Sequence, residues 1–341
     1  MNFKNMKKYI IILLCAAVLA GACAKQQSEN KNIINKEVLD AWISTNYPLV
    51  SPTGCGIYVL EDVPGTGKDI GEGGYIVTDY TSTSIAGFVS STTDETTAKK
   101  VDMWSASAYY GPVVQRTGAG NVPSGINEML KGMKVGGRRK ALIPSWLLTT
   151  DVYSTPEEYL NKVSTDLATQ IYDVTAVDYT DDILQYNRDN IDAFCKENYP
   201  SAEVVETGFW YCRTGGPSTD KAMPSDTTVK INYTGRLLNG KVFDTTKEQV
   251  AKDAGIYSKS ATYKPVSITW GSAATDLKMT VSGSSTSTTP ISGFQKTLWQ
   301  MHPGEKGVGL FDHEMGYGEK GSGAIPAYAP LIFEIELVKG E

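Results

Sequence analysis

Residues 226–246 read DTTVKINYTGRLLNGKVFDTT, and residues 73–93 read GGYIVTDYTSTSIAGFVSSTT. Both stretches place β-branched and aromatic residues on either side of a Gly-containing turn, a pattern typical of antiparallel strands. A second pair follows in the same order, SGINEMLKGMKVGGRRKAL at 124–142 and SGFQKTLWQMHPGEKGVGL at 292–310. Matching segments in the same order indicate that one domain is duplicated within the chain.

A third matching pair precedes the other two in each copy. It reads DAWISTNYP at 40–48 and DAFCKENYP at 192–200. Proline disfavours helical backbone in the residue before it, so a helix is expected to end at each Asn-Tyr-Pro. The pattern predicts helices over about 33–46 and 181–197.

A short helix is also expected inside each copy. In the second copy, its apolar face would consist of Ile291, Phe294, Leu298 and Met301. Ser292 followed by Gln295 resembles a capping box at its start. The last strand, 331–337, alternates apolar and acidic residues. The predicted fold class is therefore α+β: two domains, each an antiparallel sheet wrapped around a short helix, with a preceding helix.

Composition excludes several classes of function. The chain has 341 residues, a formal charge of −6 and a pI near 5.2, so it lacks the basic surface that nucleic acid requires. His302 and His313 are the only histidines, and neither has a neighbouring Cys, which makes a zinc site improbable. We therefore expect no metal and no cofactor.

The N-terminus predicts export. Lys4, Lys7 and Lys8 precede an apolar run that is too short to span a bilayer, and small residues then lead to Cys23. This arrangement resembles a bacterial lipobox, in which Cys23 would be lipidated; the alternative is a plain secretory signal cleaved nearby. The polar residues that follow are typical of a tether. We expect a lipid-anchored cell-envelope protein, in the outer membrane facing the periplasm.

Three segments of the second copy resemble the FKBP-type peptidyl-prolyl isomerases. They are VKINYTGRLLNGKVFDTT (229–246), PISGFQKTLWQMHPGEKGVGL (290–310) and GYGEKGSGAIPAYAPLIFEIELVKGE (316–341). The resemblance covers residues 205–341, and segments 63–81 and 125–143 of the first copy resemble the family more distantly. The expected organisation is a signal peptide (1–22), a tether (23–32), a degenerate FKBP-like domain (33–178), a linker helix (179–200) and an isomerase domain (201–341).

The resemblance also implies a proline-binding pocket. Its expected catalytic residues are Tyr233, Phe243, Asp244, Phe294 and Tyr317, and its expected substrate-binding residues are Val266, Ile291, Ile325 and Phe333. Phe294 would lie under the proline ring, and the Tyr317 hydroxyl and the Ile325 backbone N–H would hold substrate carbonyls. Val266 and Phe294 stand where the family commonly has Phe and Trp, and this smaller aromatic lining argues against tight macrolide binding more than against catalysis. Taken singly, the phenylalanines also fit a plain hydrophobic core, and Asp244 fits a turn.

The first copy departs from that pattern. Tyr80 and Tyr172 match Tyr233 and Phe333, but other positions change to residues without aromatic or acidic groups: Ser90, Ser91, Ile126 and Thr149. We expect this copy to be non-catalytic, and either to bind client polypeptides or to act as a spacer.

Two functions from different classes follow. The first is isomerisation of X–Pro bonds in exported polypeptides by the C-terminal domain. The second is a non-catalytic binding module or chaperone built on the same folds.

Two local features are also expected. A Ser/Thr-rich segment, 272–289, is expected to be a loop beside the pocket. Cys195 and Cys212 could pair in an oxidising compartment.

Overall fold

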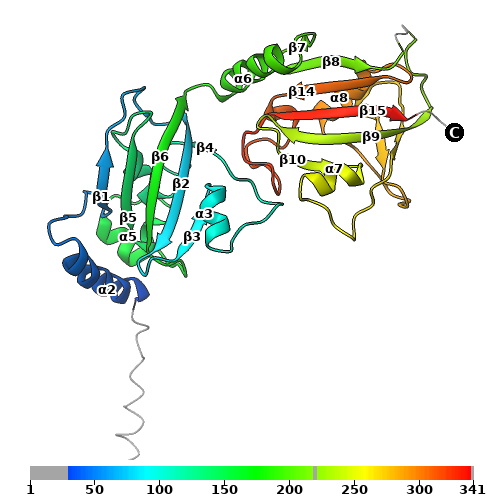
Figure 1. Cartoon of the computed structure of the whole chain (residues 1–341). Helices are drawn as coiled ribbons and strands as arrows, with labels where there is room; N and C mark the ends of the chain where they lie inside the picture. The colour runs from blue at the N-terminus through cyan, green and yellow to red at the C-terminus, as the bar shows by residue number, and fades with distance from the viewer. Residues whose placement is uncertain (1–29, 218–220, 339–341) are drawn as a thin grey trace, which may run out of the picture.

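The computed structural model describes residues 30–217 and 221–338. Two sheets, each wrapped around a short helix, follow one another along the chain (Figure 1). The predicted α+β class is confirmed. The predicted signal peptide, Cys23 and the first part of the tether lie outside the described residues. Among the residues that are described, no helix is both long enough and apolar enough to cross a bilayer.

The N-terminal sheet has the strand order β1-β5-β6-β2-β3, and β4 pairs with β2. Its strands are β1 (Tyr58–Val63), β2 (Tyr75–Ser84), β3 (Val89–Thr92), β4 (Val113–Arg116), β5 (Arg138–Ile143) and β6 (Gln170–Thr180). Its helices are α2 (Lys31–Asn46), α3 (Glu95–Lys100), α4 (Ser124–Leu130) and α5 (Pro156–Lys162), with the 3-10 turn η1 (Ser145–Leu147). Ile126, Met129 and Leu130 of α4 are buried in the core of this sheet, as an apolar helix face requires.

The C-terminal sheet has the order β13-β12-β11-β9-β15-β14-β8-β7, and β10 pairs with β9. Its strands are β7 (Glu203–Glu206), β8 (Phe209–Gly215), β9 (Thr228–Leu237), β10 (Val242–Thr245), β11 (Val266–Thr269), β12 (Lys278–Thr280), β13 (Ser287–Thr288), β14 (Lys306–Phe311) and β15 (Leu331–Val338). The remaining elements are α7 (Glu248–Asp253), α8 (Ser292–Gln300), η2 (Ala274–Asp276) and η3 (His313–Met315). Phe294 and Leu298 of α8 are buried against the sheet.

The two sheets share one strand order. In the first, β1 lies next to β5, then come β6, β2 and β3; in the second, β8 lies next to β14, then come β15, β9 and β10. The segments that match in sequence therefore occupy equivalent places. Short helices α3 and α7 also follow β3 and β10 in each copy, although the sequence patterns predicted one helix within each sheet.

Helix α6 (Ile183–Asn198) connects the two domains and packs against the second one (Figure 1). Its N-cap, Asp182, accepts hydrogen bonds from two backbone N–H groups of the first turn, which stabilises the helix start. Cys195 on its buried face lies in one cluster with Trp210 and Leu310. Cys195 and Cys212 are both free thiols, and burial raises the pKa of Cys195 to about 11.

Two local expectations were wrong. No side-chain hydrogen bond caps α8; instead the Ser292 hydroxyl donates to the carbonyl of Met315, and the Gln295 amide donates to that of Thr275. The Ser/Thr-rich segment 272–289 is not a plain loop, because β12 and β13 within it form a hairpin that extends the sheet. Leu277, which is fully buried, anchors this hairpin to the core.

Candidate functional site

Four aromatic rings from four elements meet inside the C-terminal sheet. Phe294 of α8 lies with its ring centroid 5.0 Å from that of Phe333 and 5.4 Å from that of Tyr233, both edge to face. Phe243 of β10 contacts Phe333 in the same way at 5.6 Å. Edge-to-face pairs at these distances are the favoured geometry for aromatic rings, so the cluster is self-supporting.

Gly235 allows the rings to approach one another. It lies opposite Phe333 in the ladder between β9 and β15. A Cβ at this position would lie 2.5 Å from the ring of Phe243 and 3.1 Å from that of Phe333. A larger residue here would therefore displace the aromatic walls.

A polar edge adjoins the rings. The Tyr233 hydroxyl donates a hydrogen bond of 2.7 Å to Oδ2 of Asp244, which is exposed. Burial, with a smaller contribution from the Asp244 charge, raises the pKa of Tyr233 far above its ordinary value of 10. Burial followed by the same charge also raises the pKa of Tyr317, which is 37% exposed. Both phenols are therefore protonated and able to donate at neutral pH.

A cavity of about 610 Å³ opens at this place, within the size range of ligand-binding pockets. Tyr233, Phe243, Asp244 and Val266 line it. One residue of the N-terminal domain, Ser107, also lines it, and the other lining residues are Thr245, Thr246, Ile256, Ser258, Ala261, Thr262, Tyr263, Val281, Gly323 and Ala324. Phe294 and Phe333 lie behind Tyr233 as its ring partners.

The structure corrects the role expected of Ile325. Its backbone N–H donates a 2.9 Å hydrogen bond to the carbonyl of Ser322, so this N–H is not available for a substrate carbonyl. Ile291, at the N-cap of α8, packs beside the ring cluster, and its N–H has no acceptor among the described residues. The N–H of Ile291, unlike that of Ile325, is therefore available to a substrate carbonyl.

The equivalent place in the N-terminal domain differs in chemistry. Tyr80 is hydrogen-bonded to the Ser91 hydroxyl at 3.1 Å, where Tyr233 has a carboxylate, and its ring lies 6.2 Å from that of Tyr172. Ile126 is buried in the core in place of an aromatic ring. The hydroxyl of Thr149 donates to the carboxylate of Asp151. The first copy thus keeps the fold and lacks the acid and the phenylalanine wall.

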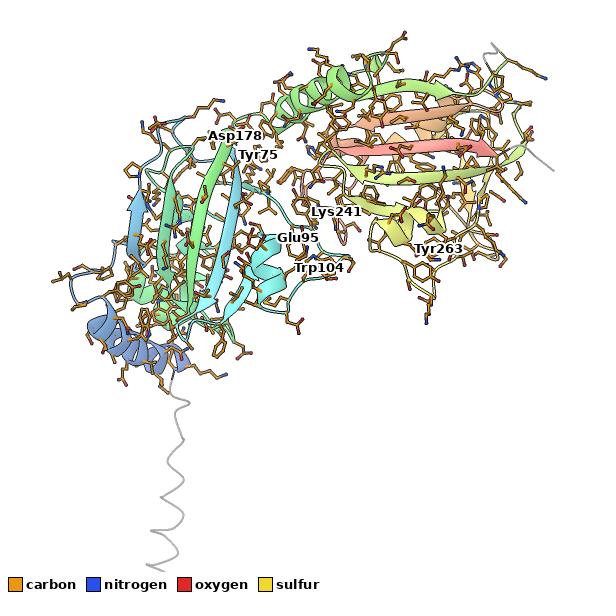
Figure 2. The ribbon with its side chains drawn as sticks, viewed as in Figure 1. Tyr75, Glu95, Trp104, Asp178, Lys241 and Tyr263 are labelled. Atoms are coloured by element: carbon orange, nitrogen blue, oxygen red, sulfur yellow. The ribbon has the colours of Figure 1, made fainter. Side chains whose placement is uncertain are left out.

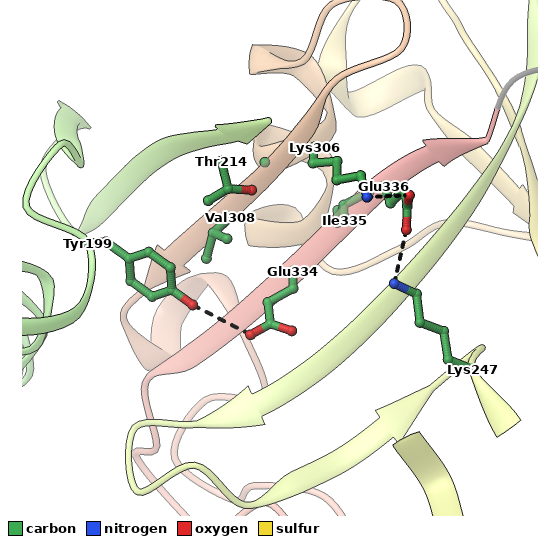
Figure 3. Close-up of a pocket in the computed structure, with 9 residues that line it drawn as sticks. Tyr199, Thr214, Lys247, Lys306, Val308, Glu334, Ile335 and Glu336 are labelled. Carbon is green, nitrogen blue, oxygen red and sulfur yellow. Dashed lines mark hydrogen bonds and ion pairs between the residues drawn. The ribbon is translucent and has the colours of Figure 1, made fainter. Parts of the chain in front are cut away.

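A second hollow lies on the outer face of β14 and β15 (Figure 3). Its charged groups satisfy one another: Lys247 and Lys306 both pair with Glu336, and the Tyr199 hydroxyl donates to Glu334. Exposed pairs of this kind stabilise a protein only slightly. Among the described residues, no cluster of His, Cys, Asp or Glu is arranged to hold a metal ion.

Comparison with known proteins places residues 219–338 in a family model described as FKBP-type peptidyl-prolyl cis-trans isomerase. The chain is 31% identical over 133 residues to FK506-binding protein 1B of Aspergillus fumigatus, covering 36% of this chain and 86% of that protein. It is 26% identical over 144 residues to the macrophage infectivity potentiator of Trypanosoma cruzi, covering 42% of this chain and 58% of that protein.

A third relative is a probable FKBP-type peptidyl-prolyl cis-trans isomerase of Haemophilus influenzae, 28% identical over 137 residues, which cover 40% of this chain and 44% of that protein. The chain thus spans about half the length of the first curated relatives that it matches.

Proposed function

The chain belongs to the FKBP-type peptidyl-prolyl cis-trans isomerase family, and we propose that its C-terminal domain catalyses rotation about X–Pro bonds. One observation carries this proposal: Tyr233, with its ring among phenylalanines and its hydroxyl on Asp244, lines a cavity of substrate size. The N-terminal domain has no carboxylate at the equivalent place, because Ser91 stands there.

The reaction needs a shaped apolar site and no nucleophile. Partial double-bond character gives rotation about the C–N bond a barrier of about 18–20 kcal/mol. Water strengthens this character by donating a hydrogen bond to the imide oxygen. A cavity that excludes water and fits the twisted imide better than the planar one lowers the barrier, and each factor of ten in rate requires about 1.36 kcal/mol.

Each site residue then has a role. Phe294 lies under the proline ring, and Phe243, Phe333 and Val266 enclose it. The protonated hydroxyl of Tyr317 and the backbone N–H of Ile291 hold the substrate carbonyls. In this arrangement Tyr233 holds the Asp244 carboxylate at the polar edge, and Ile325 contributes its buried side chain alone.

Export and anchoring form the second part of the proposal. The charged start, the short apolar run and Cys23 support a lipoprotein of the cell envelope, in the outer membrane facing the periplasm, whose clients are exported proline-containing polypeptides. The N-terminal domain would bind these clients or space the enzyme from the membrane.

We also propose that any binding of macrolides by the C-terminal domain is weak. Val266 and Phe294 give its pocket a smaller aromatic lining than the family commonly has.

The test is the rate of cis–trans isomerisation of a proline tetrapeptide by the full chain. Asp244→Ala and Tyr317→Phe should each lower kcat/KM, because both groups belong to the polar edge. The matched controls Ser91→Ala and Thr149→Val change the equivalent positions of the first copy and should leave kcat/KM at the wild-type value. A folded wild-type protein that gives no acceleration over buffer would favour the alternative, a non-catalytic binding module or chaperone.

A further inference from the structure

One segment of the N-terminal domain reaches the cavity of the C-terminal domain. This segment, the bridging loop (residues 101–112), connects α3 to β4 and extends toward β10 and α7 (Figure 1). Figure 2 shows Glu95 and Trp104 of the first domain facing Lys241 of the second. Tyr109 of the loop packs against the hydrophobic core of the C-terminal domain.

Contacts across the domain boundary hold the loop in place. The ammonium of Lys241 donates a 2.8 Å hydrogen bond to the carbonyl of Ala106, across 135 positions of sequence. The partial burial of Lys241 lowers its pKa, and the carboxylate of Glu95 opposes that effect. Farther along the boundary, the rings of Tyr75 and Tyr328 meet edge to face at 5.2 Å. The loop is therefore anchored to the second domain by one hydrogen bond and by the packing of Tyr109.

The loop has a counterpart in the second domain. Residues 105–110 read SASAYY and residues 258–263 read SKSATY. In both segments the backbone N–H of the first Ser donates to the hydroxyl of the last Tyr, at 3.0 Å in the first domain and 2.9 Å in the second. The hydroxyl of the first Ser is also hydrogen-bonded to that of the second Ser. The duplication has thus produced two serine loops with one hydrogen-bonding pattern.

The two serine loops line the same cavity. Ser107 of the first loop and Ser258 of the second are exposed, and both border the 610 Å³ cavity that contains Tyr233 and Asp244. A serine hydroxyl offers one donor and two acceptor positions, so it can bond a peptide backbone whatever side chains that peptide carries. A cavity wall of serine hydroxyls can therefore bind the backbone of an extended polypeptide, and it distinguishes little between polypeptides of different sequence.

We propose that the bridging loop is part of the substrate site: it binds the polypeptide segment that flanks the prolyl bond and thereby makes the enzyme prefer long chains over short peptides. The proposal rests on the proposed function, because the occupant is the proline-containing substrate of the C-terminal domain. The first copy contributes to recognition in this way without chemistry of its own.

The test compares two labelled proline peptides, a tetrapeptide and a peptide of about ten residues, by their dissociation constants for the full chain. Wild-type protein should bind the longer peptide about fivefold more tightly, which is the value of one hydrogen bond of about 1 kcal/mol. Ser107→Ala, which removes a hydroxyl from the wall, and Lys241→Met, which removes the anchor of the loop, should reduce that ratio.

Lys252→Met is the matched control, because Lys252 lies on the neighbouring α7 and contacts Glu248 and Tyr257 of its own domain. It should keep the wild-type ratio. A fall of the ratio in either test variant, with this control unchanged, supports the inference. It is overturned if wild-type protein binds both peptides equally, or if both test variants keep the wild-type ratio. Tighter binding of the longer peptide without acceleration of isomerisation would overturn the proposed function and leave the role of the bridging loop in binding the flanking segment standing.

Discussion

The hydrogen bond between Tyr233 and Asp244 can be removed by a single substitution. Tyr233→Phe deletes the phenolic hydroxyl and leaves the ring that contacts Phe294 and Phe333. The bond is 2.7 Å long and its acceptor is charged, and such bonds contribute about 1.5–3 kcal/mol net. Asp244 is exposed and can bind water instead, so we reduce the expected loss to about 1 kcal/mol, which is about fivefold in rate.

The assay is kcat/KM for a proline tetrapeptide, measured beside urea unfolding of the same protein. Tyr80→Phe is the matched control, because Tyr80 has the equivalent place in the first copy and bonds the neutral Ser91 hydroxyl at 3.1 Å. We expect Tyr233→Phe to lower kcat/KM about fivefold and Tyr80→Phe to leave it unchanged. Wild-type kcat/KM in folded Tyr233→Phe, or an equal loss in the control, would refute the reasoning.

Three further predictions concern packing and pH. Phe294→Ala should lower the free energy of unfolding by about 3–5 kcal/mol, because it empties a buried ring site; urea unfolding measures this, and a loss under about 1 kcal/mol would mean that the site collapses. Gly235→Ala should lower kcat/KM, since its Cβ would lie 2.5 Å from the ring of Phe243, which lines the cavity; kcat/KM equal to that of the wild type would show that the ring moves aside freely. Burial lowers the pKa of His313 below 6.5, so the folded state keeps a neutral ring that bonds Asn187, while the unfolded chain takes up a proton. The contribution of His313 to the free energy of unfolding should therefore be constant well above pH 6.5 and fall as the pH drops through about 6.5, so urea midpoints should differ less between about pH 7.5 and 5.5 in His313→Gln than in the wild type.

The sequence predicted those features that recur or alternate. The duplication was visible because three pairs of matching segments recur in the same order, one of which spans β2 and β9, and the alternation in β15 placed Phe333 on the inner face. The ring cluster followed from the family resemblance, which identified its members, and from the strand pairing, which brings them together.

Other features depend on contacts that leave no local pattern. Ile325 lost its expected role because a turn bond to Ser322 uses its N–H, and such a bond is invisible in the residue types. The hairpin of β12 and β13 was missed because its serines and threonines have the composition of a loop, while the single buried Leu277 anchors it. The contact between Lys241 and Ala106 spans two domains, and nothing near either residue indicates it.

The packing of α6 determines where the C-terminal domain can be cut from the chain. A fragment that begins at Ser201 would lack α6 and expose Trp210, Leu310 and Ile332, which now lie in one buried cluster with Cys195. Newly exposed apolar area of this kind promotes aggregation. A fragment that begins at Asp181 would keep the N-cap Asp182 and the whole helix. Expression of the two fragments as soluble protein should differ for that reason, and only the longer one is suited to assays of the isolated domain.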